Sequence, residues 1–277
     1  MKILIRGAGD IATGIALRLY RAGMQVVMTD LPAPTAIRRT VCFSQAIILG
    51  EMTVEDVTAR RAETPDQAGA LLAQGLIPVL ADPDCTCRTR LRPDALVDAI
   101  LAKRNLGTKI DDAPIVVGIG PGFTAGEDCH AVVETMRGHT LGRVIYRGSA
   151  LPNTNIPGLI GGYAGERVLR APAEGIFCQK LEIGAVVRAG DVAGEVAGQP
   201  MRCTIDGVLR GILADGTPVF RGMKAGDVDP RCKPEYCTTA SDKALAVGGG
   251  VLEAVLHLHH RNRPAEKQSQ FTGGALL

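Results

Sequence analysis

The sequence predicts an α/β fold in two parts: a Rossmann-like domain built on a parallel sheet, and a small all-β barrel-sandwich domain. Buried strands alternate with amphipathic helices in the first half, a glycine-rich turn joins the first strand to the first helix, and glycines repeat at a fixed offset in the second half. We expect the following organisation: an α/β domain at 1–165, a β-sandwich at 166–232, a C-terminal helical segment packing back on the α/β domain at 233–258, and a disordered tail at 259–277.

Composition excludes several classes of protein. The 277 residues are 46% hydrophobic, which supplies a core and argues against intrinsic disorder, and a formal net charge of +2 argues against a strongly basic nucleic-acid binder. Apolar runs such as 113–119 are too short to span a membrane, and the apolar stretch after Lys2 is too short for a secretory signal. We therefore expect a cytoplasmic protein with reduced cysteines that binds small molecules or proteins, and neither nucleic acid nor membranes; homo-oligomerisation is left open.

The first thirty residues predict a strand, a turn, a helix and a second strand. Apolar residues at 2–6 and 25–29 predict the strands, and the spacing of apolar residues over 11–22 predicts the helix. Residues 7–12 follow the pattern Gly-x-Gly-x-x-Ala, in which glycines let the backbone approach a pyrophosphate at the helix N-terminus. Asp30 closes the second strand, where folds of this type bind a ribose hydroxyl.

This arrangement favours a bound nucleotide-like ligand. The alternative is a plain strand-to-helix turn in which an aspartate caps the helix. The candidate cofactor-binding residues of this segment are Gly7, Gly9, Asp10, Ala12 and Asp30.

The alternation of strands and helices continues to residue 136. We expect helices at 65–74, 93–104 and 127–136, and strands at 77–81 and 114–119. A second glycine-rich loop, 120–126, follows the last strand, and such loops line the ligand crevice of parallel sheets. Gly120, Gly122 and Phe123 are therefore further candidate cofactor-binding residues; the alternative is a turn with unusual dihedral angles, since Pro121 removes one N–H donor.

The second half contains an internal duplication. Two glycine triplets have the same internal spacing and an offset of 32 residues: Gly175, Gly184, Gly190 and Gly207, Gly216, Gly222. The surrounding sequence resembles the biotinyl/lipoyl carrier domain, which implies a flattened sandwich of two similar halves. Carriers hold a modifiable Lys on the turn between the halves, whereas residues 197–201 contain none. We expect a structural or docking element.

The C-terminal region predicts a helix over 240–258 that contains three consecutive glycines at 248–250. Each glycine costs about 1 kcal/mol relative to Ala in a helix, which indicates either close packing or a break. His257 lies on a different helical face from His259 and His260, and no Cys or carboxylate is near in sequence, so we expect no metal site.

Short segments in a fixed order connect these features: 7–14, 97–103 with 105–108, 120–123, 134–139, 153–154, 226–231, 241–244 and 251–254. Together they resemble the selenium-dependent molybdenum hydroxylase system proteins of the YqeB type, from residue 1 to about residue 256. The resemblance implies a role in maturing enzymes whose molybdenum cofactor carries selenium, without defining the molecular step. Asn155, where the family tends to have Gly, and Leu245, where Arg is expected, depart from the pattern.

Selenium or sulfur handling requires a thiolate, which makes the cysteines candidate catalytic residues. Cys237 precedes a segment that carries the family resemblance. We expect it to face the same cleft as Gly9 and Gly122, joined there by Asp242 and Lys243 from the returning helix, with Lys243 countering an anionic group. The alternative is an inert structural cysteine in an apolar joint.

Three further features have alternative interpretations. Cys85 and Cys87 precede several arginines, and we favour a solvated loop over a redox site. Cys129 falls in the first turn of a predicted helix, where a thiolate is favoured. The charged turn 226–231 either binds a ligand or pairs internally at a domain joint.

The leading function is an accessory protein that binds a nucleotide-containing molybdenum cofactor or its precursor and assists its delivery, or selenium insertion, to a hydroxylase. Its cofactor would be a dinucleotide or a molybdenum-pterin nucleotide, and its partners a molybdenum hydroxylase or other maturation proteins. Two alternatives are an NAD(P)-dependent oxidoreductase, and a non-catalytic docking adaptor that uses the sandwich. Whether the chain is an enzyme is left open.

Overall fold

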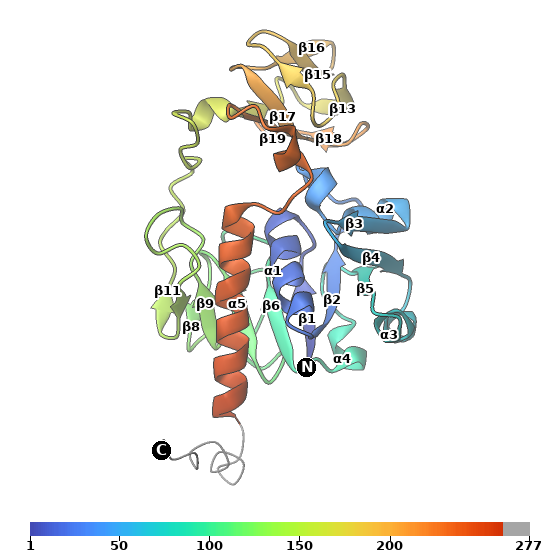
Figure 1. Ribbon diagram of the computed structural model, residues 1–277, viewed down its shortest axis with the longest axis vertical. Helices are drawn as coiled ribbons and strands as arrows, with labels where there is room; N and C mark the ends of the chain where they lie inside the picture. The colour runs from blue at the N-terminus through green and yellow to red at the C-terminus, as the bar shows by residue number, and fades with distance from the viewer. Residues whose placement is uncertain (263–277) are drawn as a thin grey trace, which may run out of the picture.

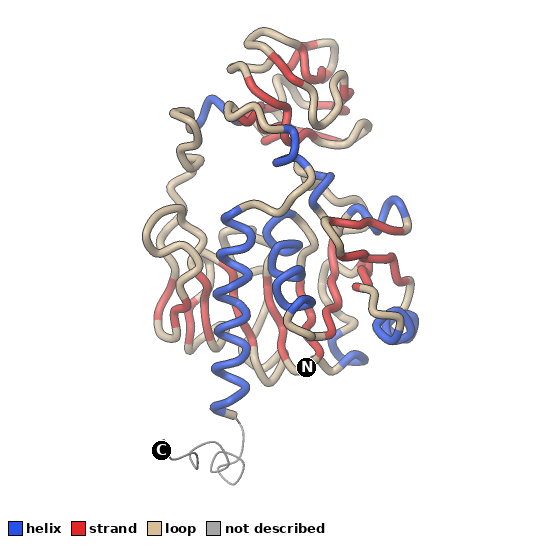
Figure 2. Tube along the Cα trace, in the orientation of Figure 1, coloured by secondary structure: helices blue, strands red, loops and turns tan. Residues whose placement is uncertain are grey.

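The computed structural model describes residues 1–262 and contains two units (Figure 1). The larger unit is built on a nine-stranded sheet, and two helices, α1 (Asp10–Arg21) and α5 (Asp242–Arg261), lie side by side against it (Figure 2). The smaller unit, yellow to orange in Figure 1, consists of antiparallel strands. Segments from before the small unit, from after it and from near residue 38 run between the two units.

The large sheet has the strand order β10-β9-β7-β6-β1-β2-β5-β4-β3. Its strands are β1 (Lys2–Arg6), β2 (Gln25–Asp30), β3 (Glu51–Val54), β4 (Val57–Ala62), β5 (Ile77–Ala81), β6 (Ala95–Asp98), β7 (Val116–Ile119), β9 (Ala131–Val133) and β10 (Val144–Ile145). Neighbours from β9 through to β4 pair in parallel, whereas β3 and β10 add antiparallel edges. The central strands are buried on both faces, which explains their continuous apolar runs.

Short elements complete the large unit. They are α2 (Gln45–Leu49), α3 (Pro65–Ala73), α4 (Arg88–Leu91), the 3-10 turn η1 (Arg39–Val41), and a two-stranded sheet of β8 (Thr124–Ala125) with β11 (Gly148–Ser149). Helix α3 begins at a proline, and the Thr64 hydroxyl accepts a hydrogen bond from the Gln67 N–H, which caps it.

The predicted Rossmann-like parallel sheet is wrong. The helix expected at 93–104 is strand β6 followed by a loop with left-handed backbone at Leu101 and Lys103, and the helix expected at 127–136 contains strand β9. Apolar residues at helical spacing in 93–104 favour a helix locally, but residues 95–98 pair in parallel with β1 and β7, and 131–133 pair with β7, so tertiary pairing overrides the local pattern. The sheet is mixed, with an antiparallel strand at each edge.

The small unit forms two four-stranded antiparallel sheets, with orders β12-β19-β17-β14 and β16-β15-β13-β18. Its elements are the 3-10 turn η2 (Gly165–Arg167), β12 (Val168–Arg170), β13 (Gly175–Gln179), β14 (Val186–Val187), β15 (Val192–Val196), β16 (Gln199–Arg202), β17 (Gly207–Ile212), β18 (Pro218–Val219) and β19 (Lys224–Asp229). Strands 13, 14 and 15 begin 32 residues before strands 17, 18 and 19, and the paired triplet glycines all have positive φ, so the duplication is confirmed.

The predicted biotinyl/lipoyl-like sandwich is also corrected. The middle strand of each duplicated half pairs with a strand of the other half: β14 pairs with β17, and β18 pairs with β13. Strands β12 and β16 extend the two sheets, which contain eight strands in total. The unit is also continuous with the large one: the Ile212 N–H donates to the Ile37 carbonyl, and a Cβ on Gly211 would lie 2.9 Å from the same oxygen.

Helix α5 follows the 3-10 turn η3 (Pro234–Cys237) and packs on α1 through small residues. A Cβ on Gly14 would lie 2.5 Å from the Ala244 Cβ, and one on Gly248 would lie 2.8 Å from the Gly14 carbonyl oxygen. A Cβ on Gly250 would lie 2.2 Å from the Gly142 carbonyl oxygen. The glycine run therefore serves close packing, and the helix does not break.

The helix continues to Arg261, so His259 and His260 are helical. The rest of the predicted tail, 263–277, lies outside the described residues. Within residues 1–262, no helix has the length and apolar character that crossing a membrane requires.

Candidate functional site: a pocket at the start of helix α1

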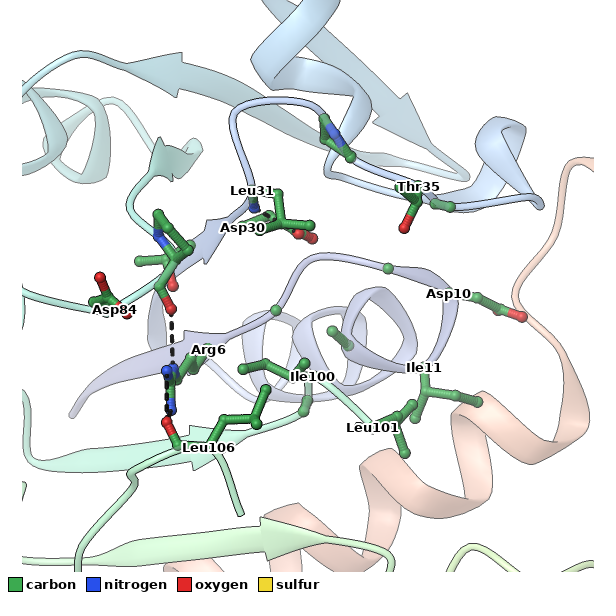
Figure 3. A pocket seen from close by; sticks show the side chains of 18 residues that line it. Arg6, Asp10, Ile11, Asp30, Leu31, Thr35, Asp84, Ile100, Leu101 and Leu106 are labelled. Carbon is green, nitrogen blue, oxygen red and sulfur yellow. Dashed lines mark hydrogen bonds between the residues drawn. The ribbon is translucent and has the colours of Figure 1, made fainter. Parts of the chain in front are cut away.

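A pocket of about 480 Å³ lies at the carboxyl ends of four adjacent parallel strands, β6, β1, β2 and β5 (Figure 3). Parallel sheets bind ligands at the carboxyl ends of their strands, at the point where the strand order reverses. Here that point is β1, which has β2 on one side and β6 on the other. Five sequence-predicted residues line this pocket: Gly7, Gly9, Asp10, Ala12 and Asp30.

The two glycines of the turn have different roles. Gly7 has φ +107°, and a Cβ there would lie 2.8 Å from the Ala99 carbonyl oxygen, so Gly7 is needed for the fold. Gly9 has an ordinary φ of −74°, and a Cβ there would meet no atom within 4 Å. Gly9 is the N-cap of α1, and no side chain accepts from the first-turn N–H groups. The positive end of the helix dipole is thus open to a ligand.

Asp30 holds the turn in place. Its carboxylate accepts hydrogen bonds from the Ala8 N–H and the Leu31 N–H, each at 2.7 Å. Burial raises the pKa of Asp30 above its ordinary value, while the two N–H donors act in the opposite direction. Asp30, which the sequence predicts to bind a ribose hydroxyl, therefore also fixes the backbone of the turn through its hydrogen bond with the Ala8 N–H.

Arg6 and Thr29 are pocket residues that sequence reasoning missed. The buried Arg6 guanidinium donates to the carbonyls of Pro83 and Leu106 (Figure 3) and to the Thr108 hydroxyl at 3.0 Å. The Thr29 hydroxyl oxygen is buried and makes no hydrogen bond to nitrogen or oxygen in the structure. Its neighbour is the Cys85 thiol, whose pKa Thr29 lowers, so the hydroxyl has a weak sulfur partner and a ligand would have to compete with it.

Apolar side chains form the other wall of the pocket. Ile11, Ile100, Leu101 and Leu106 lie along one side of it (Figure 3). Leu101 adopts φ +62°, which is strained for a branched residue and holds the loop after β6 against the pocket. The pocket therefore combines polar groups with an apolar surface, as ligand pockets usually do.

Asp10 lies at the edge of this pocket, at the end opposite to Arg6 (Figure 3). Both of its carboxylate oxygens accept hydrogen bonds at 2.9 Å from Arg38, whose guanidinium also donates to the Tyr236 and Thr239 carbonyls. Asp10 thus joins α1 to the chain that precedes α5.

The second glycine-rich loop does not line the pocket, so the expectation that Gly120, Gly122 and Phe123 share one cleft with Gly9 is wrong. Gly122 has φ +109°, and a Cβ there would lie 2.6 Å from the Arg104 backbone. Gly120 packs against Thr135 in the same manner, and Phe123 is buried. These residues form a tight turn and part of the core.

The residues predicted to be catalytic, Cys237, Asp242 and Lys243, do not line the pocket that contains Gly9. Cys237 is buried at the end of η3, and burial raises the pKa of its thiol, so it is the structural cysteine of the alternative interpretation. Asp242 accepts two hydrogen bonds from Arg137, which lower its pKa to about 2. Lys243 opens into a different cavity.

The remaining cysteines do not support a reactive thiol in the pocket. Cys85 and Cys87 are buried, so the predicted solvated loop is wrong, and the pKa of Cys85 is lowered by the neighbouring Cys87 thiol while that of Cys87 is raised. Burial raises the pKa of Cys129 to about 11. Among residues 1–262, no group of three or more His, Cys, Asp or Glu side chains could hold a metal ion.

The charged segment 226–231 is held by ion pairs, and residues 226–229 of the predicted turn belong to strand β19. Asp227 binds Arg167 and Arg210, and Asp229 binds Arg210 and Arg231, with both carboxylates buried. These contacts support the interpretation in which the charges pair with one another at a joint.

The fold and the pocket define a mixed α/β protein with a ligand pocket at the carboxyl ends of parallel strands. The chain is similar to "Uncharacterized protein YqeB" of Escherichia coli strain K12, with 52% identity over 266 residues, which cover 96% of this chain and 49% of that protein. The chain thus spans about half the length of the curated relative it matches. No family model matches.

Similarities to solved structures are weak. An aspartoacylase family protein from Mesorhizobium loti is 12% identical, with 73% of this chain and 83% of that one covered and a TM-score of 0.25. A succinylglutamatedesuccinylase/aspartoacylase from Rhodobacter sphaeroides is 19% identical, with 49% and 58% covered and a TM-score of 0.22.

Proposed function

We propose that the chain is an accessory protein in the maturation of selenium-dependent molybdenum hydroxylases, and that it binds a nucleotide-containing molybdenum cofactor or its precursor in the pocket at α1. The observation that carries the proposal is the uncapped N-terminus of α1, which opens into the pocket beside Gly9.

The pocket chemistry supports such a ligand. Phosphate oxygens would accept from the first-turn N–H groups of α1, and the Thr29 hydroxyl, in competition with the Cys85 thiol, would add a hydrogen bond. A flat ring system would pack on Ile100 and Leu101. A volume of about 480 Å³ accommodates part of a dinucleotide or a pterin nucleotide.

The pathway assignment is supported by the ordered motifs of residues 1 to 256, which resemble the selenium-dependent molybdenum hydroxylase system proteins. The partner would then be a molybdenum hydroxylase or one of its maturation proteins, to which the chain delivers the cofactor or at which it assists selenium insertion. With Cys237 buried and its pKa raised, the accessory role rests on cofactor binding and not on a transfer cysteine.

Mass spectrometry of small molecules released from protein purified out of its own host tests the proposal. We expect a molybdenum- or pterin-containing nucleotide at a stoichiometry near one per chain. Recovery of NAD(P) in its place would favour the oxidoreductase alternative, and recovery of no ligand would favour the docking adaptor.

A further inference from the structure

A second cavity, of about 700 Å³, lies between the two units. Its wall includes β12 and β19 of the small unit, the segments 134–137 and 151–158 of the connecting chain, and the first turn of α5. Five cationic side chains line it: Lys103, Arg137, Arg170, Lys224 and Lys243.

This wall contains a single carboxylate, that of Glu134, which forms no ion pair with any of the five cations. Glu134 is buried, and its oxygens already accept hydrogen bonds from the N–H groups of Thr135, Met136 and Leu151 at 2.6 to 2.8 Å. Its role is to fix the backbone on two sides of the cavity.

Two of the cations face each other directly. Arg170 and Lys224 are partners in the antiparallel pairing of β12 with β19, a position at which like charges destabilise a sheet. The Arg170 guanidinium donates to the Gly222 carbonyl, an uncharged partner. No acidic side chain offsets this pair within the cavity wall other than the occupied Glu134.

Two of the three lysines in the wall have ammonium groups without a protein partner. Within the described chain, the side chains of Lys224 and Lys243 make no hydrogen bond or ion pair, whereas the Lys103 ammonium group donates to the Asn155 side-chain oxygen. Lys243 is half-buried and Lys224 is exposed. Desolvation lowers the pKa of both lysines, and the charges of Arg137 and Lys224 lower that of Lys243 further. Arg137 is itself paired with Asp242. The mutual repulsion of these cations costs free energy, which a bound anion offsets.

We propose that this cavity is a second binding site, for a small molecule that carries two or more negatively charged oxyanion groups, phosphate or carboxylate. The ligand would bridge Lys224 and Arg170 on the small unit and Lys243 on α5. Because these cations belong to separate elements, the ligand would also hold the two units together. The site shares no lining residue with the pocket at α1, although the loop after β6 gives Leu101 to that pocket and Lys103 to this cavity.

Calorimetric titration of the full chain with inorganic pyrophosphate and with citrate tests the proposal. We expect at least one probe to bind, and Lys224→Gln and Lys243→Gln each to weaken that binding by ten-fold or more. The order of the two affinities distinguishes a phosphate from a carboxylate ligand. The matched control Lys109→Gln removes the same charge from an exposed lysine outside both pockets and should leave the dissociation constant unchanged.

Two further readouts separate this site from its alternatives. The melting temperatures of Lys224→Gln and Lys243→Gln should be no lower than that of the wild type, because neither ammonium group has a protein partner to lose. Gly9→Val should not change the binding of either probe. The proposal is wrong if neither probe binds at millimolar concentration, if the lysine variants bind as the wild type does, or if only Gly9→Val weakens binding.

Discussion

Gly7 and Gly9 belong to one turn and one sequence pattern, yet only Gly9 is open to a ligand. The distinction depends on two local quantities, the φ angle and the space around a Cβ, neither of which the pattern Gly-x-Gly-x-x-Ala specifies. Asp30 illustrates the same point. The sequence pattern predicts a contact with a ligand, and it does not specify that the Asp30 carboxylate accepts hydrogen bonds from the Ala8 and Leu31 N–H groups.

Gly7→Ala should lower the free energy of unfolding by about 2–3 kcal/mol, because the new Cβ meets the Ala99 backbone and φ is positive. Gly9→Ala should change it by less than about 0.5 kcal/mol. Urea unfolding followed by circular dichroism measures both. Equal destabilisation by the two substitutions would contradict the roles assigned here.

Elements pack through small residues in this protein, most clearly where α5 lies on α1 and against the loop at Gly142 (Figure 2). Three adjacent glycines of α5 have different surroundings: Gly248 and Gly250 are buried in contact with backbone, whereas Gly249 is exposed with no atom near its Cβ position. The run therefore combines two packing positions with one that only weakens the helix.

Gly249→Ala should raise the free energy of unfolding by about 0.5–1 kcal/mol, since Ala is the better helix former and nothing obstructs it. Gly250→Ala should lower it by about 1–3 kcal/mol, because its Cβ would lie 2.2 Å from the Gly142 carbonyl oxygen. Thermal and urea unfolding of the two variants provide the comparison. Stabilisation by Gly250→Ala would show that α5 does not pack here as described.

At the scale of elements, sequence patterns predict what is local. The strand, turn and helix at the N-terminus and the 32-residue duplication follow from spacing within short segments. The helices predicted at 93–104 and 127–136 are wrong because parallel pairing with distant strands overrides the local helical pattern, and a local pattern carries no information about that pairing. The cationic cavity has no sequence signature, since Lys103, Arg170 and Lys243 come from distant segments.

The whole molecule is held together by buried polar contacts between its two units. Arg38 binds Asp10 of α1, the Tyr236 carbonyl of η3 and the Thr239 carbonyl between η3 and α5, and Arg39 donates to the Ile212 carbonyl of β17. These contacts fix the two units around the cationic cavity and keep the end of α1 in place beside the pocket.

Arg38→Met should lower the free energy of unfolding by about 2–4 kcal/mol, because it leaves Asp10 and two carbonyl groups without their donor in a largely buried site. The control Arg60→Met breaks an exposed ion pair with Glu51 and should cost less than about 1 kcal/mol. Urea unfolding measures the difference. Similar losses from the two substitutions would mean that Arg38 does not join the units.

The central claim is that the uncapped start of α1 binds a nucleotide-like ligand, and ligand occupancy in a Gly9→Val protein tests it most directly. Gly9 has ordinary backbone angles, so valine should leave the circular dichroism spectrum and the melting temperature nearly unchanged while its side chain projects into the pocket. Gly69→Val is a matched control in α3, where a Cβ also meets no atom within 4 Å and no pocket residue is near in sequence. We expect the compound that is released from wild-type and Gly69→Val protein to be absent from Gly9→Val protein; equal recovery from all three folded proteins would contradict the assignment of the pocket.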